Sequence, residues 1–406
     1  MLCYHTDEGT ATYNVTAGVP QGSVLGPLLW NIMYNDVLEL NIPTEAKIIG
    51  FADDIAITVT SRYLDEVELI SSEVVYSVKN WMRNAGLELA EHKTEIVLVT
   101  SKRKRENMRI TIGEHQLTSK PYLKYLGLII DDRLKFKTHI EHISNKASNI
   151  RTALERMMPN IGGPMQSKRK IISTVIASVI LYAAPIWAGA LKTKAISKNI
   201  KSVYRRAVLR VCCSYRTTSD EAAHVIAGMI PIDILVDEAK RLDDIKRSST
   251  QINSSIRKVE RDKSVRQWQN IWETSRKGRW TYNLIPRINI WLNRKHGEVN
   301  YYLTQFLSGH GGYRSYLYRF GLDTTPYCPH CPNREENPEH VVFHCPRFNQ
   351  ERREAEEVIG CLNVQNIISV MLNKKEYWDI ICWMIKSIHE KLAMEEKQRK
   401  SQIDVA

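Results

Sequence analysis

The chain has 406 residues, of which 43% are hydrophobic and 25% charged, proportions that are ordinary for a globular protein of two or three domains. Its eight cysteines are sparse and no signal peptide begins the sequence, which excludes a secreted disulfide framework and indicates a reducing compartment. The formal net charge of +12 favours a polyanionic partner, either nucleic acid or an anionic membrane surface.

The first 60 residues predict a strand, a helix and a hairpin. A strand is expected within residues 11–20, ahead of a turn rich in glycine and proline, and a short, largely buried helix within residues 26–40. Residues 48–60 contain two apolar runs of high strand propensity, broken by Asp53 and Asp54. This pattern predicts a hairpin with two acids at its turn.

The two acids of this hairpin are candidate ligands for a metal ion. Carboxylates in a strongly apolar hairpin are costly unless a positive charge compensates them, and Mg²⁺ prefers hard oxygen ligands of this kind. Neighbouring side chains on a strand point to opposite faces, so both acids can approach one cation only near a turn. An ordinary Asp-Asp turn without a metal is the alternative.

The next segment predicts one helix and three strands. Apolar residues at helical spacing favour a helix over residues 63–85, and Gly86 is a typical stop. Strands are expected over residues 87–100, 109–118 and 121–130.

Helices are expected to dominate from residue 137 onward, and residues 162–164 (Gly-Gly-Pro) separate the first helix from the next. Residues 171–191 carry no charge and are long enough to span a bilayer. Pro185 interrupts them and basic residues flank both ends, so a buried core helix is expected and a membrane span is the alternative.

The basic excess is concentrated in residues 133–210, which hold 16 lysines and arginines but only two acids. Such a one-sided stretch repels itself unless an anion neutralises it, which predicts contact with phosphates. A solvated charged face is the alternative. The run at residues 102–105 (Lys-Arg-Lys-Arg) fits a nuclear localisation patch or a solvated loop.

Near the end of the chain, Cys328-x2-Cys331-x8-His340-x4-Cys345 has the spacing of a zinc site. Four protein ligands leave no open position, so the predicted zinc is structural rather than catalytic. His344 is a competitor of His340 for the fourth place, and buried free thiols are the alternative to any metal.

Four blocks in the first third of the chain occur in a characteristic order. GVPQGSVLGPLL, FADD, GLELAEHKTEIVLV and YLKYLGLIID together resemble the reverse transcriptases of non-LTR (LINE-like) retrotransposons, with the arthropod type closest. The segments GHGGYRSYLYRFGLDTTPYCPHC and PEHVVFHCPRF resemble the C-terminal zinc knuckle of the same family. Group II intron maturases are weaker relatives because this knuckle does not fit them.

The resemblance implies an α+β fold with a partial polymerase palm, built from an antiparallel sheet with helices, followed by a helical thumb and a small zinc knuckle. The implied domains are a partial palm (1–135), a basic helical thumb (136–230), a helical connector (231–300), the Cys/His knuckle (301–350) and a helical C-terminal tail (351–406).

The resemblance also implies roles for single residues. Asp53 is similar to the metal-binding acid of the polymerase hairpin and Asp54 to its neighbour, both toward Mg²⁺. Phe51 fills the aromatic position before Ala-Asp-Asp; it is expected to pack under the hairpin and is counted with the residues at the nucleotide and template site. Pro20, Gln21 and Gly22 are similar to the loop that lies against the nucleotide and template, and Leu126 and Gly127 to the primer grip. Lys93 is similar to the lysine that assists the pyrophosphate leaving group, and a solvated loop lysine is the alternative.

The implied activity is RNA-directed DNA polymerisation by two-metal nucleotidyl transfer, with Mg²⁺ at the polymerase site and structural Zn²⁺ at the knuckle. The implied partners are an RNA template, a DNA primer or target and dNTPs, with no membrane, in an intracellular ribonucleoprotein, nuclear or cytoplasmic. Family members carry another metal-binding aspartate well upstream of the Pro-Gln-Gly turn, but only 17 residues precede Gly18 here. We therefore expect an N-terminally truncated chain that does not polymerise alone, and the alternative is a catalytically dead remnant that binds nucleic acid.

Overall fold

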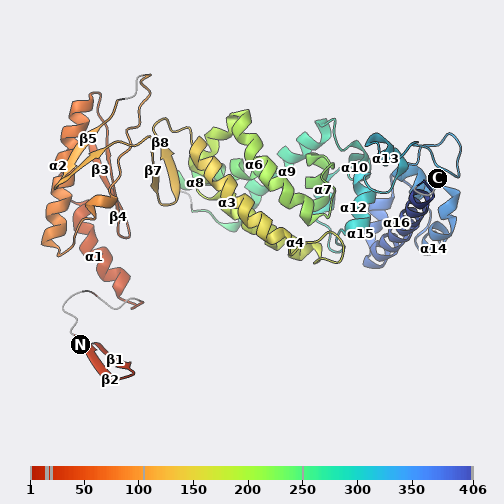
Figure 1. Cartoon of the computed structure of the whole chain (residues 1–406), viewed down its shortest axis with the longest axis horizontal. Helices are drawn as coiled ribbons and strands as arrows, with labels where there is room; N and C mark the ends of the chain where they lie inside the picture. Colours follow the sequence, from red (N-terminus) through yellow and green to blue (C-terminus); the bar gives the residue numbers. More distant parts are fainter. Residues whose placement is uncertain (1, 14–17, 19–21, 104–105, 249–250, 404–406) are drawn as a thin grey trace. The chain divides into compact units, whose positions relative to one another are not determined.

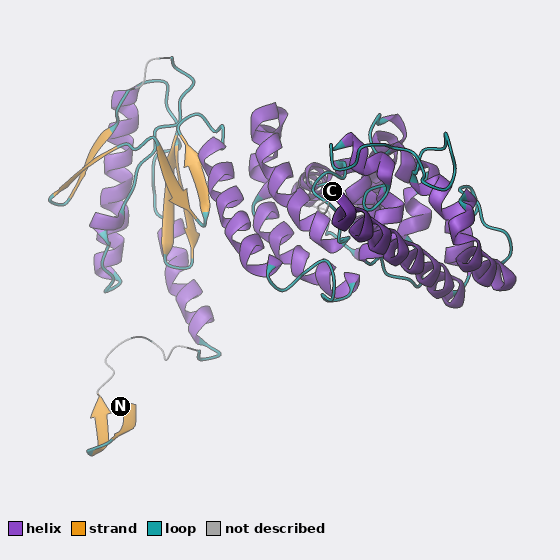
Figure 2. Ribbon diagram, turned by 45° about the vertical axis from the view of Figure 1, so that its right-hand side comes forward, coloured by secondary structure: helices purple, strands orange, loops and turns teal. Residues whose placement is uncertain are grey.

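The computed structural model describes residues 2–13, 18, 22–103, 106–248 and 251–403. The predicted nucleotide-loop residues Pro20 and Gln21 and the second half of the basic run at residues 102–105 lie outside the described residues. The chain divides into two compact units, Met1–Leu134 and Lys135–Ala406 (Figure 1). Strands occur in the first unit, whereas the elements of the second are helices (Figure 2).

The first unit is a mixed α/β unit. Its elements are β1 (Leu2–Thr6), β2 (Gly9–Tyr13), α1 (Gly26–Leu38), β3 (Ala46–Phe51), β4 (Asp54–Val59), α2 (Leu64–Asn84), the 3₁₀ helix η1 (Glu91–Lys93), β5 (Arg109–Ile112), β6 (His115–Thr118), β7 (Tyr122–Tyr125) and β8 (Leu128–Asp131). The described strands pair as four separate two-stranded antiparallel sheets, β1–β2, β3–β4, β5–β6 and β7–β8. The expected combination of antiparallel strands and helices is therefore present, and in the described residues the strands form small separate sheets.

Helices α1 and α2 both pack against the hairpin β3–β4. The core between them is formed by the buried side chains of Tyr34, Val37 and Val78, with Trp81 and Ile48 packed around them. The hairpin over residues 48–60 is confirmed, and so is the helix over residues 63–85, which ends before Gly86. Gly86 has a φ of 71°, the left-handed conformation that commonly follows a helix.

The expectation of a largely buried helix over residues 26–40 was wrong in its burial. Helix α1 buries only Tyr34 and Val37, which face the hairpin and α2. Leu28, Leu29 and Ile32 stay 47–62% exposed, because among the described residues α1 makes its main packing contacts with β3 and the core cluster through its other side. A predominantly apolar helix sequence therefore does not reveal how many of its sides are covered.

The strand expected over residues 87–100 does not form. Residues 91–93 make a 3₁₀ turn, and beyond it only Val97 forms an isolated bridge, to Lys120. Leu89 and the alternating pair Ile96 and Leu98 pack instead against the buried cluster of Met108, Ile110 and Ile112. The alternation of apolar residues in this segment thus reflects burial of one side of an extended chain rather than pairing with a neighbouring strand.

The ranges 109–118 and 121–130 each fold into a hairpin rather than a single strand. The first turns at Gly113, with a φ of 59°, and the second at Leu126 and Gly127, with φ values of 45° and 82°. In the second turn both central residues have positive φ, the geometry that closes a two-residue hairpin with the natural strand twist. Leucine rarely adopts it, because its Cβ is crowded there.

The second unit is helical. Its elements are α3 (Lys137–Glu155), α4 (Gln166–Leu181), α5 (Ala184–Trp187), η2 (Ala188–Lys192), α6 (Lys194–Val211), α7 (Asp220–Ala227), α8 (Ile232–Arg247), α9 (Ser254–Thr274), α10 (Arg279–Leu284), α11 (Ile288–Leu292), α12 (Tyr301–Ser308), α13 (Arg314–Arg319), η3 (His340–His344), η4 (Pro346–Phe348), α14 (Asn349–Ile359), α15 (Ile367–Asn373) and α16 (Lys375–Ile403). Helices α3, α4 and α6 pack against one another, and α16 packs against α12, α14 and α15.

The uncharged segment 171–191 is divided between α4, α5 and η2, with the break just before Pro185. Ala183 takes a left-handed φ of 50° at this break, and the two parts meet at 54°. Among the described helices, none is by itself long and apolar enough to cross a bilayer, and this bent pair meets the requirement only when its two parts are combined. Within the unit, Ser173, Ile176 and Ile180 of α4 are fully buried.

Part of the basic excess in residues 133–210 is neutralised inside the protein. Arg169 is buried and donates hydrogen bonds to the carbonyl oxygens of Met158, Pro159, Pro164 and Arg210. Other cations pair with acids outside the stretch, as Lys201 does with Asp233 at 2.7 Å and Arg205 with Asp220. Seven exposed cations keep no acidic partner within the described residues: Lys146, Arg156, Lys168, Lys192, Lys194, Lys198 and Arg206.

Candidate metal centres

The first candidate centre is the turn of the hairpin β3–β4. Phe51 pairs with Asp54 in the register, so Ala52 and Asp53 are the two turn residues and Asp54 begins β4. Ala52 has a φ of 52°, a conformation that costs energy for a residue with a Cβ. The tight turn sets Asp53 and Asp54 next to each other at one end of the hairpin, and both are exposed.

The register also decides which way each side chain of the hairpin faces. The pairs Ile48–Ile57 and Gly50–Ile55 lie on the side that packs against α1 and α2. Because side chains alternate along a strand, Phe51 and its partner Asp54 lie on the opposite, uncovered side. Phe51 is 59% exposed, so the expectation that it packs under the hairpin was wrong. Its ring is instead exposed on the side of the hairpin that also carries Asp54.

Two aromatic side chains of α1 fix the backbone of this turn. The Trp30 indole Nε1 donates to the Ala52 carbonyl at 3.2 Å, and the Tyr34 hydroxyl donates to the Asp54 carbonyl at 3.3 Å. Burial raises the pKa of Tyr34, and the nearby Asp53 and Asp54 carboxylates raise it further. Trp30 and Tyr34 were not anticipated as site residues, although their spacing of four residues on a helix next to the hairpin was a usable signal.

Gly50 makes the approach of Tyr34 to the hairpin possible. A Cβ on Gly50 would collide with the Tyr34 ring, so we expect Gly50→Ala to displace Tyr34 and weaken the hairpin by about 1–3 kcal/mol, the usual range for overpacking. Hydrogen exchange of the amides of residues 46–59 measures this effect. Gly189→Ala is the matched control, because a Cβ there meets nothing within 4 Å. Unchanged hydrogen exchange in Gly50→Ala would contradict the proposed role of Tyr34 in holding the hairpin.

The other palm candidates are not joined to these acids by a hydrogen bond or ion pair within the described residues. Lys93 ends η1 and is exposed. Leu126 and Gly127 form the turn of β7–β8, and Gly22, with a φ of 84°, precedes α1. No third acid, histidine or cysteine gathers with Asp53 and Asp54 in the described part of the chain.

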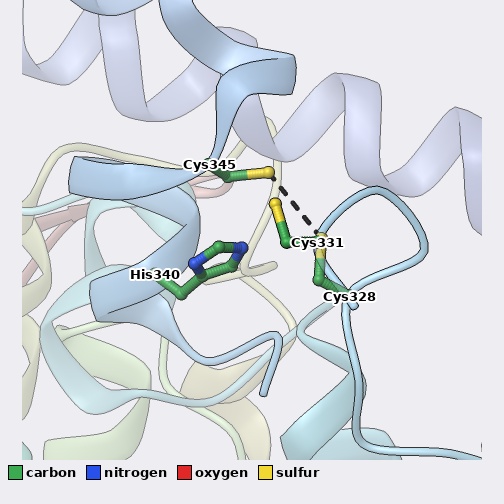
Figure 3. Close-up of side chains that lie close together, drawn as sticks. All are labelled: Cys328, Cys331, His340 and Cys345. Carbon is green, nitrogen blue, oxygen red and sulfur yellow. Dashed lines mark hydrogen bonds between the residues drawn. The ribbon is translucent and has the colours of Figure 1, made fainter. Parts of the chain in front are cut away.

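The second candidate centre lies in the other unit. The ligand atoms of Cys328, Cys331, His340 and Cys345 all lie within 4.8 Å of one another, and their side chains converge (Figure 3). The sulfurs of Cys328 and Cys345 are 3.7 Å apart. Two sulfurs bound to one tetrahedral zinc at about 2.3 Å would be separated by about the same distance. The group includes His340 and does not include His344.

Two backbone turns bring the four side chains together. The Cys328 amide donates to the Arg334 carbonyl at 2.8 Å and the Arg334 amide to the Cys331 carbonyl at 3.2 Å, which folds the first cysteine pair back on itself. The Cys345 amide donates to the His340 carbonyl at 2.7 Å, closing a wide π turn over residues 340–345. A π turn is uncommon and frequently occurs at functional positions. Here it brings the last two ligands together.

The chemistry of these donors fits zinc. Nε2 of His340 is buried without a hydrogen-bond partner among the described residues, which is costly unless something binds it. Burial lowers the pKa of His340, favouring the neutral imidazole that binds metals, and burial raises the pKa of Cys331 to about 11. Zinc binding must then displace a proton from this thiol, so affinity should fall as the pH is lowered.

Arg347 connects the cluster to the surrounding fold. It is only 6% exposed and donates from Nε to the sulfur of Cys345 at 3.4 Å and from Nη2 to that of Cys328 at 3.6 Å. The same guanidinium pairs with the buried Glu336 and with Glu395 of α16. Three thiolates and Zn²⁺ carry a net negative charge, which this cation offsets. In the sequence, the only signal for this role is one arginine two residues after a cysteine.

We expect Arg347→Met to lower zinc affinity roughly 10- to 100-fold, the usual effect of removing a group that holds metal ligands. Competition with a colorimetric zinc chelator measures the affinity. Arg353→Met is the matched control, because Arg353 is exposed on the neighbouring helix α14 and contacts no ligand. Equal affinity in the two variants would contradict a role for Arg347.

Comparisons with known proteins give one family match. The family described as reverse transcriptase (RNA-dependent DNA polymerase) matches residues 1–130. No solved structure shows a significant match.

Three curated relatives illustrate the similarity. A Nasonia vitripennis "Retrovirus-related Pol polyprotein from type-1 retrotransposable element R1" is 28% identical over 79% of this chain and all of its own length. The "Putative 115 kDa protein in type-1 retrotransposable element R1DM" of Drosophila melanogaster is 25% identical over 84% of this chain and 35% of its own length. A Drosophila melanogaster "Probable RNA-directed DNA polymerase from transposon X-element" is 30% identical over 43% of this chain and 19% of its own length.

Proposed function

We propose that this chain, which belongs to the reverse transcriptases of non-LTR retrotransposons, supplies the metal-binding hairpin and the nucleic-acid contacts of an RNA-directed DNA polymerase. The observation that carries this proposal is the turn of β3–β4. It presents Asp53 and Asp54 together, inside the residues that match the reverse transcriptase family.

In the proposed mechanism, Asp53 and Asp54 would hold Mg²⁺, and the bound cation would supply the Lewis-acid chemistry that nucleotidyl transfer needs. Trp30 and Tyr34 hold the turn carbonyls, so that the carboxylates do not need to reorganise when the cation arrives. The uncovered side of the hairpin, which carries Phe51, is the side open to a nucleotide or template base.

The remaining palm residues keep their proposed roles from family resemblance. Pro20, Gln21 and Gly22 belong to the loop against the incoming nucleotide and template. Lys93 assists the leaving pyrophosphate, and Leu126 and Gly127 grip the primer. The positive φ of Gly22 supports its role, because such a turn lets backbone approach a ligand closely.

Two metals need more carboxylate ligands than one acid pair offers. Since no third acid joins Asp53 and Asp54 within the described residues, we propose that catalysis requires a further carboxylate from outside this group. The test is primer extension on RNA with dNTPs and Mg²⁺. The 406-residue chain alone should give no robust extension. If the chain alone extends the primer robustly and Asp53→Ala abolishes this extension, the need for a further carboxylate is contradicted but the polymerase activity is supported.

The proposed nucleic-acid partners are an RNA template and a DNA primer or target. The seven exposed cations without acidic partners, which lie on or beside α3, α4 and α6, support contact with phosphates. The zinc proposed for Cys328, Cys331, His340 and Cys345 is structural, because four protein ligands leave no place for water or substrate.

A further inference from the structure

We propose that a cavity between α7, α10 and α13 binds a single-stranded segment of nucleic acid, holding a phosphate between Lys277 and Arg319 and stacking a base on Phe320. The proposal deepens the proposed function and rests on it, because it names a second place where this chain holds its nucleic acid. The cavity has a volume of about 300 Å³.

Three distant segments of the second unit form the walls of the cavity. Thr217, Thr218 and Ser219 come from the loop that leads into α7. Lys277 and Gly278 come from the turn between α9 and α10. The third wall, which includes Arg319 and Phe320, comes from α13 and the residues around it. The cavity therefore exists only in the folded unit.

The charge of the cavity suits an anion. Lys277 and Arg319 are exposed, and neither has an acidic partner within the described residues. None of the described residues that line the cavity is acidic, and the nearby Asp220 and Glu221 line a separate cavity instead. The Ser219 hydroxyl of the α7 wall also lines the cavity; its oxygen accepts from the Ala222 amide, so its O–H remains as a donor beside the two cations. A phosphate group fits such a combination of cations and a hydroxyl.

Aromatic rings form a ladder that ends at the cavity. The ring centroids of His310 and Tyr316 are 4.7 Å apart, and those of Tyr316 and Phe320 are 4.9 Å apart. Phe320 is 45% exposed and ends the ladder, so its ring has a free area for another ring. The Arg319 guanidinium lies 5.2 Å from the Phe320 centroid. A phosphate site beside an open aromatic ring fits a strand whose bases are unpaired.

The hydrogen bonds of His310 fix the polar side of the cavity. Its Nδ1 lies 3.0 Å from the Thr217 hydroxyl, which is also 2.7 Å from the Tyr316 hydroxyl. Burial and, to a smaller extent, the nearby Arg319 lower the pKa of His310 to about 4, so the ring is neutral near pH 7. The α7 wall and the α13 wall are thereby joined.

The test uses the zinc-loaded full chain and fluorescence anisotropy with two probes. One is an unpaired oligonucleotide of roughly 12 nucleotides, and the other is a blunt duplex of the same length. We expect Phe320→Ala to weaken single-strand binding roughly 5- to 100-fold, with little effect on the duplex. Lys277→Gln combined with Arg319→Gln should lower the salt slope of single-strand binding by about 0.7 for each phosphate that is no longer neutralised.

Each variant has a matched control. Tyr318→Ala removes an exposed aromatic residue of α13 that does not line the cavity, and Lys258→Gln with Arg266→Gln removes two exposed cations of α9. Combined glutamine substitutions of Lys192, Lys194 and Lys198 should show the opposite selectivity, weakening duplex binding more than single-strand binding. This comparison separates the cavity from the basic helices.

Cavity variants that bind the single strand as tightly as their controls would overturn the inference. An equal loss on single strand and duplex would overturn it as well. The cavity variants lie in the other unit from the hairpin, so Mn²⁺ binding by the hairpin is measured in the same proteins and should be unchanged. If the cavity variants keep full single-strand affinity while the hairpin still binds metal, this inference alone is refuted. If the hairpin binds no metal, the proposed function is refuted.

Discussion

Replacing Cys331 with serine is expected to release zinc and to unfold residues 325–348 locally. A serine hydroxyl does not replace a thiolate in a structural zinc site, and structural zinc contributes on the order of 10 kcal/mol or more to the folding of small zinc modules. Without zinc, the buried polar groups of this segment, including Nε2 of His340, have no binding partner, and their burial becomes unfavourable. This substitution should therefore have a larger structural effect than removal of any exposed side chain.

Zinc stoichiometry and hydrogen exchange measure the Cys331→Ser effect together. The expected result is loss of bound zinc with fast exchange limited to residues 325–348 and to α13, because the Ser315 amide of α13 donates to the carbonyl of Glu336 within this segment. Cys361→Ser is the matched control, since Cys361 is an exposed free thiol outside the cluster. Full zinc content in Cys331→Ser would contradict the assignment of the four ligands.

Replacing Asp53 with alanine is expected to lower the affinity of the hairpin for a divalent cation by more than roughly tenfold, since even groups that only support metal ligands usually contribute that much. Mn²⁺ is a suitable probe, because it binds to oxygen ligands as Mg²⁺ does and its free concentration is readily measured by electron paramagnetic resonance. Asp53 is exposed at the turn, so its removal should not unfold the hairpin.

Two further variants make the Asp53→Ala result specific. Asp36→Ala removes an exposed acid of α1 outside the turn and should leave Mn²⁺ binding unchanged. Asp53→Asn keeps the shape of the side chain and removes only its charge, and it should behave like Asp53→Ala. Equal Mn²⁺ affinity in Asp53→Ala and Asp36→Ala would show that the turn does not bind the cation.

The parts of the fold that the sequence predicted correctly depend on local patterns. The hairpin of β3–β4 follows from two apolar runs around Asp53 and Asp54, and α2 from an apolar stripe that ends at Gly86. The cysteine and histidine spacing likewise anticipated side chains that the fold brings together, because only short turns separate them. These features need little information from distant residues.

The features that the sequence did not reveal depend on contacts between distant residues. The strand expected over residues 87–100 failed because its apolar side packs against Met108 and Ile110 rather than beside a strand. The orientation of Phe51 depends on where α1 and α2 dock on the hairpin. Arg347 reaches the cluster from outside the ligand pattern, and Thr217, Lys277 and Arg319 line one cavity from positions far apart in the chain.

Iron-mediated cleavage of the zinc-loaded protein tests the central claim most directly, because Fe²⁺ occupies Mg²⁺ sites and, with ascorbate and peroxide, cuts the backbone next to itself. In the first unit, we expect cleavage confined to the turn at residues 51–54 and lost in Asp53→Ala. No cleavage at this turn, or equal cleavage in Asp53→Ala, would contradict the claim that this hairpin gathers divalent cations for nucleotidyl transfer.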